Sequence, residues 1–302
     1  AVIDEAVKVG APFSDSQLVH LYRACLLKDE DAAKAEVHLA SGLSSVGNHP
    51  LRIEETGMFD RLAALCPENA VVHYLYGNLL YYIGQKENGL TQWRMAADLD
   101  PSSALACRNV GFGEGQKGNY EEALKYYDKA IKNNPDDPLL FAESDKICEK
   151  AGVPAVQRQK RLEAGLKTVM KYDDAVIRLL KVYNETGNWN KAIKIMDSRH
   201  FHLWEGGGEI HDIYVMSHIL KGKSLLDRKA YKKAMEEFRL ATLYPDNLEV
   251  PAPAKSVTIE DVIAEMRQEL NDNYAKFGDE DSVSKAKSLD ELEKLVKEIK
   301  MK

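Results

Sequence analysis

The sequence lacks the marks of several large protein classes. It has no run of about 18 or more apolar residues, so no segment is expected to span a membrane. Basic residues are not in excess, because 41 Lys and Arg stand against 48 Asp and Glu, and the net charge of −7 argues against a nucleic-acid-binding surface. The first residues, AVIDEAVKVG, have neither the basic start nor the long apolar run of a signal peptide. Because an initiating Met is also missing, we expect the chain to be a piece of a longer protein or a processed product.

Signatures of enzymes are absent as well. The sequence has no Gly-rich phosphate loop with a Walker A lysine and no G-x-S-x-G motif. Its cysteines, Cys25, Cys66, Cys107 and Cys148, lie 41 residues apart, and none has the near Cys neighbour that is typical of a zinc site. Isolated cysteines favour a reducing compartment. We therefore predict a cytoplasmic protein that is not an enzyme and has no catalytic residue, cofactor or metal.

A 34-residue repeat is the strongest feature of the sequence. The matching positions, each 34 residues apart, are Gly77 with Gly111, Trp93 with Tyr127, Ala96 with Ala130 and Pro101 with Pro135. Small residues at such positions let two antiparallel helices touch, a large aromatic residue fills the space beside them, and proline ends the second helix. This pattern resembles the tetratricopeptide repeat (TPR), which implies an all-α, right-handed superhelix, or α-solenoid.

Later units keep the pattern with less regular spacing. Ala192 and Ala234 occupy the same repeat position but lie 42 residues apart, eight more than 34, so we expect a loop insertion near residues 198–209. The unit with its turn at Gly152 lacks the small alanine of its second helix and is predicted to be degenerate. The domain prediction is divergent N-terminal helical repeats over residues 1–66, TPR units over 67–250, and a linker with extra C-terminal capping helices over 251–302.

Several strings between residues 67 and 250 go beyond a generic TPR pattern. They are YLYGNLLY, CRNVGFGE, ICEKAGVP, the Asp173-Asp174 pair before LLKVYNETG, RHFHLWEGG and LATLYPDNLEV. Together they resemble the TPR region of a bacterial protein family, and RHFHLWEGG and YPDNL are the specific matches. Leu203 stands where that family usually has proline, and the part after Val250 does not resemble a further unit. The resemblance implies an upstream β-rich domain similar to sugar-mutarotase folds, a carbohydrate setting, and no catalytic residue in this region.

The first helix of each TPR unit is expected to line a concave groove. Counting offsets along the repeat places Tyr74, Asn78, Tyr81 and Tyr82 of one unit and Leu105, Arg108 and Phe112 of the next in this groove. The partner-binding candidates are Tyr74, Asn78, Tyr81, Arg108, Asn109 and Phe112. Aromatic side chains beside Arg and Asn suit an extended peptide, although packing between repeats is the alternative for Tyr81 and Tyr82. Asn78 and Asn109 match two positions of the carboxylate clamp of chaperone-binding TPRs. Because Tyr74 replaces the first lysine of that clamp, a chaperone tail is not the expected partner.

The insertion holds a second group of candidates for a specialised contact. They are His200, His202, Trp204 and Glu205. His200 and His202 are two residues apart, so in an extended segment their side chains point to the same side. We expect hydrogen-bonded structural imidazoles, because the close helical pair of a zinc motif is missing. A metal site and a ligand contact are the alternatives.

These features predict a protein-interaction scaffold. The expected partner is a protein or peptide, or the chain's own upstream domain, bound in the TPR groove. The alternative function is an accessory region of a carbohydrate-processing enzyme. No nucleic-acid or membrane partner is expected, and the sequence does not indicate the oligomeric state.

Overall fold

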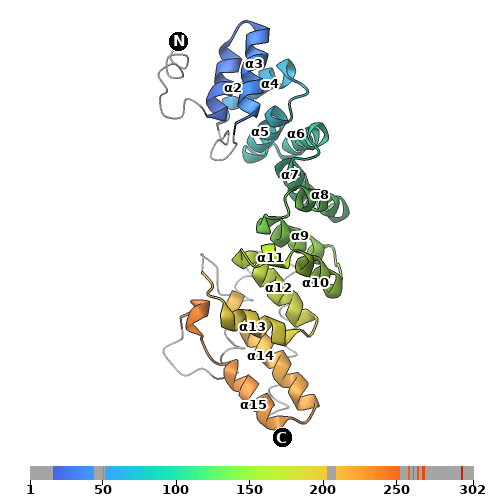
Figure 1. The fold of residues 1–302 in the computed structure, drawn as a ribbon, viewed down its shortest axis with the longest axis vertical. Coiled ribbons are helices and arrows are strands. Elements are labelled where there is room, and N and C mark those ends of the chain that lie inside the picture. Colours follow the sequence, from blue (N-terminus) through green and yellow to red (C-terminus); the bar gives the residue numbers. More distant parts are fainter. Residues whose placement is uncertain are drawn as a thin grey trace. The chain divides into compact units, whose positions relative to one another are not determined.

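The computed structural model describes residues 16–43, 50, 52–202, 209–251, 258, 261, 264, 267, 268 and 294. In this part of the chain there are fourteen α-helices, one 3-10 turn and no strand, which confirms the all-α prediction. The chain divides into two compact units, Ala1–Val153 and Pro154–Lys302, each described by itself. Figure 1 shows successive helices of each unit running back and forth. No helix among the described residues is both long and apolar enough to cross a membrane.

The helices follow one another with short connections. In the N-terminal unit they are α2 (Gln17–Leu26), α3 (Glu30–Ser41), α4 (Glu55–Leu65), α5 (Ala70–Tyr82), α6 (Lys86–Leu99), α7 (Ala104–Gln116), α8 (Tyr120–Asn133) and α9 (Pro138–Lys150). In the C-terminal unit they are α10 (Ala155–Ala164), α11 (Leu166–Val169), α12 (Asp173–Glu185), α13 (Trp189–Ser198), α14 (Glu209–Asp227), α15 (Tyr231–Leu240) and the 3-10 turn η1 (Asp246–Leu248). The capping helices predicted within 251–302 lie almost entirely outside the described residues.

Helix boundaries in the N-terminal unit follow the 34-residue period. The first helices α5, α7 and α9 begin at residues 70, 104 and 138, and the second helices α6 and α8 begin at 86 and 120. The side chains of Asn69, Ser103 and Asp137 each accept a hydrogen bond from a first-turn N–H, which fixes these starts. The turn within each pair passes through glycine with positive φ, 91° at Gly84 and 82° at Gly118, which glycine adopts without strain.

Small residues let the two helices of a pair touch. A Cβ atom added to Gly77 of α5 would lie 2.7 Å from Nε1 of Trp93 and 2.9 Å from the carbonyl oxygen of Gly89, both on α6. In the next pair Gly111 of α7 faces the ring of Tyr127 on α8 in the same way. The small and large positions deduced from the repeat are therefore the positions at which paired helices meet.

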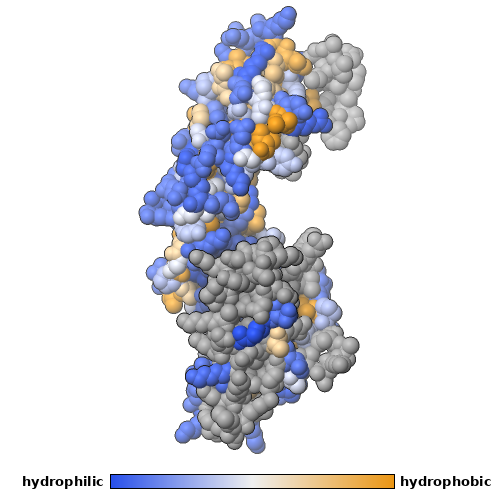
Figure 2. All heavy atoms as spheres, turned by 180° about the vertical axis from the view of Figure 1, so that it is seen from behind, coloured by the Kyte–Doolittle hydropathy of each residue, from blue (hydrophilic) through white to orange (hydrophobic). Residues whose placement is uncertain are grey.

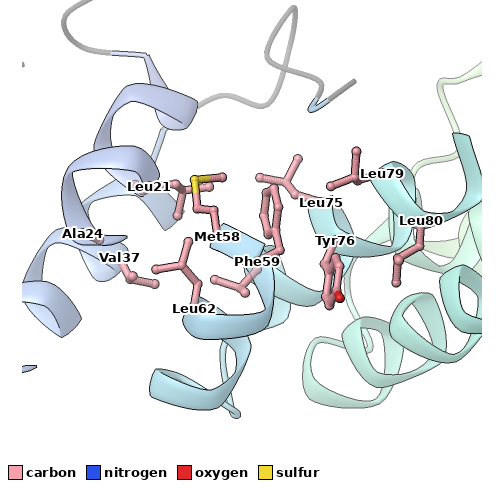
Figure 3. Close-up of a cluster of buried hydrophobic side chains, with 12 residues drawn as sticks. Leu21, Ala24, Val37, Met58, Phe59, Leu62, Leu75, Tyr76, Leu79 and Leu80 are labelled. Carbon is pink, nitrogen blue, oxygen red and sulfur yellow. The ribbon is translucent and has the colours of Figure 1, made fainter. Parts of the chain in front are cut away.

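The N-terminal helices α2, α3 and α4 extend the core of the repeats. Leu21 of α2, Val37 of α3 and Phe59 of α4 are fully buried in one cluster with the apolar face of α5. Figure 3 shows this cluster, with the Phe59 side chain placed between the helices. The rings of Phe59 and Tyr76 of α5 stack with their centroids 5.7 Å apart. Helices α2, α3 and α4 thus bury the side of α5 that its partner α6 does not cover.

The repeat predicted to be degenerate is divided between the two compact units. Its first helix, α9, ends the N-terminal unit, and α10 begins the C-terminal unit after the turn at Gly152. The buried residues of α10 are Arg158 and Leu162. A long arginine thus occupies the buried face of α10, where α8 has the small residues Ala123 and Ala130.

The C-terminal unit buries a histidine–glutamate pair between α14 and α15. Nδ1 of His218 lies 2.8 Å from Oε2 of Glu237, whose other oxygen lies 2.7 Å from Nζ of Lys221. Nε2 of His218 has no hydrogen-bond partner among the described residues, which fits a neutral imidazole that donates from Nδ1. Burial lowers the pKa of His218 below its ordinary value, and the Glu237 carboxylate opposes this shift only in part.

We expect this pair to make the C-terminal unit sensitive to acid. Below about pH 6.5 the unfolded chain binds a proton at His218 more readily than the folded chain does. The contribution of His218 to the free energy of unfolding is therefore fully present above that pH and is lost as the pH falls below it. Asparagine can still donate to Glu237 but cannot titrate, so His218→Asn should flatten the fall of the urea midpoint as the pH drops from about 7 to about 5. His38→Asn, at an exposed position of α3, is the control. An equal fall in the wild type and in His218→Asn would contradict this assignment.

Candidate functional site

The groove candidates lie together on the first helices of two pairs, Tyr74, Asn78 and Tyr81 on α5 and Arg108, Asn109 and Phe112 on α7. Oδ1 of Asn78 accepts a hydrogen bond from Nε1 of Trp93 on α6 and another from Nδ2 of Asn109, both at 2.8 Å. One amide oxygen therefore connects both helices of the first pair to the second pair. The two asparagines thus form hydrogen bonds within the chain that join one helix pair to the next.

Tyr81 lies in a stack of aromatic rings between the same helices. Its ring centroid is 4.7 Å from that of Trp93 in a stacked arrangement and 5.7 Å from that of Phe112 in an edge-on arrangement. Burial, followed by the nearby charge of Glu87, raises the pKa of Tyr81. Tyr81 therefore packs between the helices of successive pairs, and its role in partner binding stays a prediction.

Arg108 forms a bidentate ion pair with Glu143 of the next repeat. Its Nε lies 2.8 Å and its Nη2 2.5 Å from the two carboxylate oxygens of Glu143 on α9. The hydroxyl of Tyr127 donates to the same carboxylate at 3.2 Å. Hydrogen bonding to Glu143 raises the pKa of Arg108, so the guanidinium stays charged. The bidentate carboxylate-binding capacity of Arg108 is therefore taken up by Glu143 of the same chain.

Apolar surface remains on these first helices beside the engaged residues. Tyr82, at the end of α5, is 65% exposed, and Leu105, in the first turn of α7, is 49% exposed. Tyr74 and Phe112 are half-buried and pack against the core. By the repeat offsets all four side chains belong to the positions that line a TPR groove. Tyr82 and Leu105 are the most accessible of them.

The second group of candidates lies after α13 in the C-terminal unit. His200 and His202 follow Arg199, whose backbone is extended, on a segment without helix or strand, and Phe201 between them is 1% exposed. Burial of the central side chain turns both histidines toward solvent, as the alternation of an extended backbone requires. Their ring centroids are 5.2 Å apart. Trp204 and Glu205 lie outside the described residues.

The turn η1 and the start of helix α12 hold this segment in place. The N–H of Phe201 donates to the carbonyl oxygen of Asn247 at 2.9 Å, and Nδ2 of Asn247 donates to the carbonyl oxygens of Met196 and Arg199. Asp173, at the start of α12, accepts from Nε of Arg199 at 2.8 Å and from the N–H of His202 at 3.0 Å. The strings RHFH and PDNLE and the Asp173-Asp174 pair, which carry the family resemblance, therefore meet at one place.

Sequence reasoning missed one member of this cluster, Glu249. Its Oε1 lies 2.6 Å from Nε2 of His200 and 3.6 Å from Nδ1 of His202. The backbone of Glu249 has φ of +54°, a left-handed conformation that is uncommon outside glycine and that aims its side chain back at the histidines. The string YPDNLEV had marked the region, but its 47-residue separation from His202 concealed the contact.

Comparison with protein families identifies one repeat directly. The model of the tetratricopeptide repeat family matches residues 104–137, which cover α7, α8 and the turn that follows. This match begins at the second of the three 34-residue units seen in the helix boundaries.

Two curated relatives match over part of their length. The chain is 26% identical over 153 residues to the DnaJ homolog subfamily C member 7 homolog of Schizosaccharomyces pombe, covering 44% of this chain and 31% of that protein. It is 26% identical over 116 residues to the small glutamine-rich tetratricopeptide repeat-containing protein 2 of Mycosarcoma maydis, covering 37% of this chain and 32% of that protein. The chain thus spans about a third of the length of these relatives.

Solved structures resemble the chain at low identity. One is YrrB, described as a TPR protein with an unusual peptide-binding site, with 18% identity, a TM-score of 0.46, and coverage of 61% of this chain and 90% of that one. Another is the C-terminal part of a TPR repeat-containing protein of Cytophaga hutchinsonii, with 15% identity, a TM-score of 0.47, and coverage of 82% and 93%. With its matched repeat and its helix pairs at a 34-residue period, the chain is an all-helical TPR-like repeat protein.

Proposed function

We propose that the N-terminal unit is a protein-interaction scaffold that binds an extended peptide segment along α5 and α7. The observation that carries the proposal is the pair of solvent-exposed apolar side chains, Tyr82 and Leu105, at groove positions of two adjacent first helices. Figure 2 shows apolar patches among hydrophilic residues on one face of this unit. Aromatic and aliphatic side chains of this kind anchor peptides by burying apolar area.

The internal contacts of the groove support the proposal through pre-organisation. Asn78, Tyr81 and Arg108 are engaged in hydrogen bonds, a ring stack and an ion pair, and so they hold α5 and α7 in a fixed arrangement. A surface that is already rigid loses little conformational entropy when a partner binds. In this proposal Tyr74, Phe112, Tyr82 and Leu105 contact the partner, and the engaged residues position them.

The partner in this proposal is a protein or peptide segment. A segment of the upstream domain that the family resemblance implies is one form of it. The expected carbohydrate setting rests on the family resemblance alone and stays a prediction. So do the absence of enzyme activity and the cytoplasmic location.

Peptide display on the whole chain tests the proposal. We expect selected peptides to bind about tenfold more weakly to Leu105→Ala and Tyr82→Ala, because each substitution removes an apolar anchor. Met95→Ala is the matched control, since Met95 is 38% exposed but lies on α6, the second helix of its pair. Peptides that bind both groove variants as tightly as the wild type would refute the proposed surface.

A further inference from the structure

The exposed cluster of His200, His202 and Glu249 combines two imidazoles with a carboxylate. One potential ligand atom from each residue lies within 4.8 Å of the other two, and all three side chains are exposed. Two histidines and one glutamate form the protein ligand set of several catalytic zinc sites, in which the remaining position is open. Within the described residues this is the one group of three such side chains close enough to share an ion.

We propose that Nε2 of His200, Nδ1 of His202 and the carboxylate of Glu249 bind a divalent first-row transition metal, with Zn²⁺ as the reference ion. Imidazole with carboxylate suits zinc, nickel, copper and iron, whereas magnesium and calcium prefer oxygen ligands alone. Three protein ligands leave at least one coordination position for water or for a donor group of a bound partner. This inference does not depend on the proposed peptide surface, which lies in the other unit.

The distances require only a small adjustment of side chains. Ligand atoms about 2.0–2.1 Å from a tetrahedral zinc ion lie about 3.3 Å from one another. The observed separations from Oε1 of Glu249 are 2.6 Å to His200 and 3.6 Å to His202. His200 and His202 keep 54% and 73% of their side-chain surface exposed, so rotation about their side-chain bonds can reach the metal geometry.

The backbone beneath the ligands is already fixed. Phe201 is buried between the two histidines, and its N–H is bonded to Asn247, two residues before Glu249. Asp173 accepts from the N–H of His202 and so holds the other end of the segment. These hydrogen bonds fix the backbone from which the ligands project, so little of the chain has to be ordered when an ion binds.

A hydrogen bond between His200 and Glu249 is the simpler explanation of part of this geometry. It accounts for the 2.6 Å contact between those two residues. It does not account for a second imidazole, on the same side of a pinned segment, whose Nδ1 lies 3.6 Å from the same oxygen. The two explanations differ in what His202 contributes to metal binding, and a titration can measure that contribution.

Calorimetric titration of Zn²⁺ into the whole, metal-free chain near neutral pH tests the proposal. We expect one Zn²⁺ per chain and no heat from Mg²⁺. His202→Ala and Glu249→Gln should each weaken Zn²⁺ binding by at least about 100-fold, since the loss of a supporting residue alone costs about 10- to 100-fold. His38→Ala and Glu236→Gln, at exposed positions elsewhere, should leave it unchanged.

Two further measurements separate the outcomes. Circular dichroism checks that the variants keep their helices, as expected for exposed positions. The visible spectrum of the Co²⁺-loaded wild type, which needs no variant, should show bands of imidazole and carboxylate ligation without charge transfer from thiolate. Cys107 and Cys148 are buried, and burial raises the pKa of the Cys107 thiol, which disfavours the metal-binding thiolate. No Zn²⁺ binding, binding that both variants keep within about threefold, or a thiolate spectrum would overturn the proposal.

Discussion

Replacing Gly77 by alanine is expected to destabilise the N-terminal unit by about 2 to 3 kcal/mol. The added Cβ would meet the indole of Trp93 and would lie 2.9 Å from the backbone oxygen of Gly89, so α5 and α6 must separate. Trp93 cannot shift without loss, because it is bonded to Asn78 and stacked on Tyr81. The higher helix propensity of alanine contributes only about 1 kcal/mol of stability. The cost of overpacking is larger, so the net effect on the free energy of unfolding is destabilising.

The control is the same substitution at Gly57, in the third position of α4. A Cβ added there has no atom within 4 Å, so helix propensity acts alone and Gly57→Ala should stabilise by about 0.5 to 1 kcal/mol. The measurement is the urea midpoint followed by circular dichroism at the helical signal. Opposite shifts for the two variants are the expected result. A stabilising Gly77→Ala would mean that α5 and α6 are not in the close contact described.

Removing Glu143 is the second change with a large expected effect. Glu143→Ala leaves the half-buried guanidinium of Arg108 without its carboxylate and the hydroxyl of Tyr127 without its acceptor. Losing one partner of a fully buried ion pair costs about 3 to 5 kcal/mol, and the partial exposure of this pair lowers our expectation to about 2 to 3 kcal/mol. Thermal and urea unfolding of the whole chain measure this loss.

A double variant shows whether the broken ion pair causes the stability loss of Glu143→Ala. In Arg108→Leu/Glu143→Ala no charge is left unpaired, so this double variant should be more stable than Glu143→Ala alone. If the stability losses of the single variants Arg108→Leu and Glu143→Ala simply add up in the double variant, the two groups act independently. Such additivity would mean that Arg108 is not held by Glu143 and is available to a binding partner.

The repeat made much of the fold predictable. Small residues, large aromatics and prolines at a 34-residue spacing predicted the helix pairs, and the capping residues Asn69, Ser103 and Asp137 recur at the same interval. These features act within a few residues of one another, so they can be recognised along the chain. The right-handed superhelix and the proposed domain boundaries depend on how distant parts are placed, and they stay predictions.

The candidate sites were less predictable, because side-chain contacts decide which of their members are available. Repeat offsets placed Asn78, Tyr81 and Arg108 in the groove, but they could not show that a neighbouring helix already binds each of them. The histidine pair was visible in the sequence as two residues on one side of an extended segment. Its glutamate was not, since Glu249 belongs to a turn that follows two further helices.

By itself the sequence determined that this is a TPR-like chain of helix pairs and which small residues let paired helices touch. Those properties arise from short-range sterics, capping and the period of the apolar residues. Only the tertiary structure decided that most groove candidates serve inter-repeat contacts and that His200, His202 and Glu249 meet. Both depend on contacts between segments separated by whole helices, which no local pattern specifies.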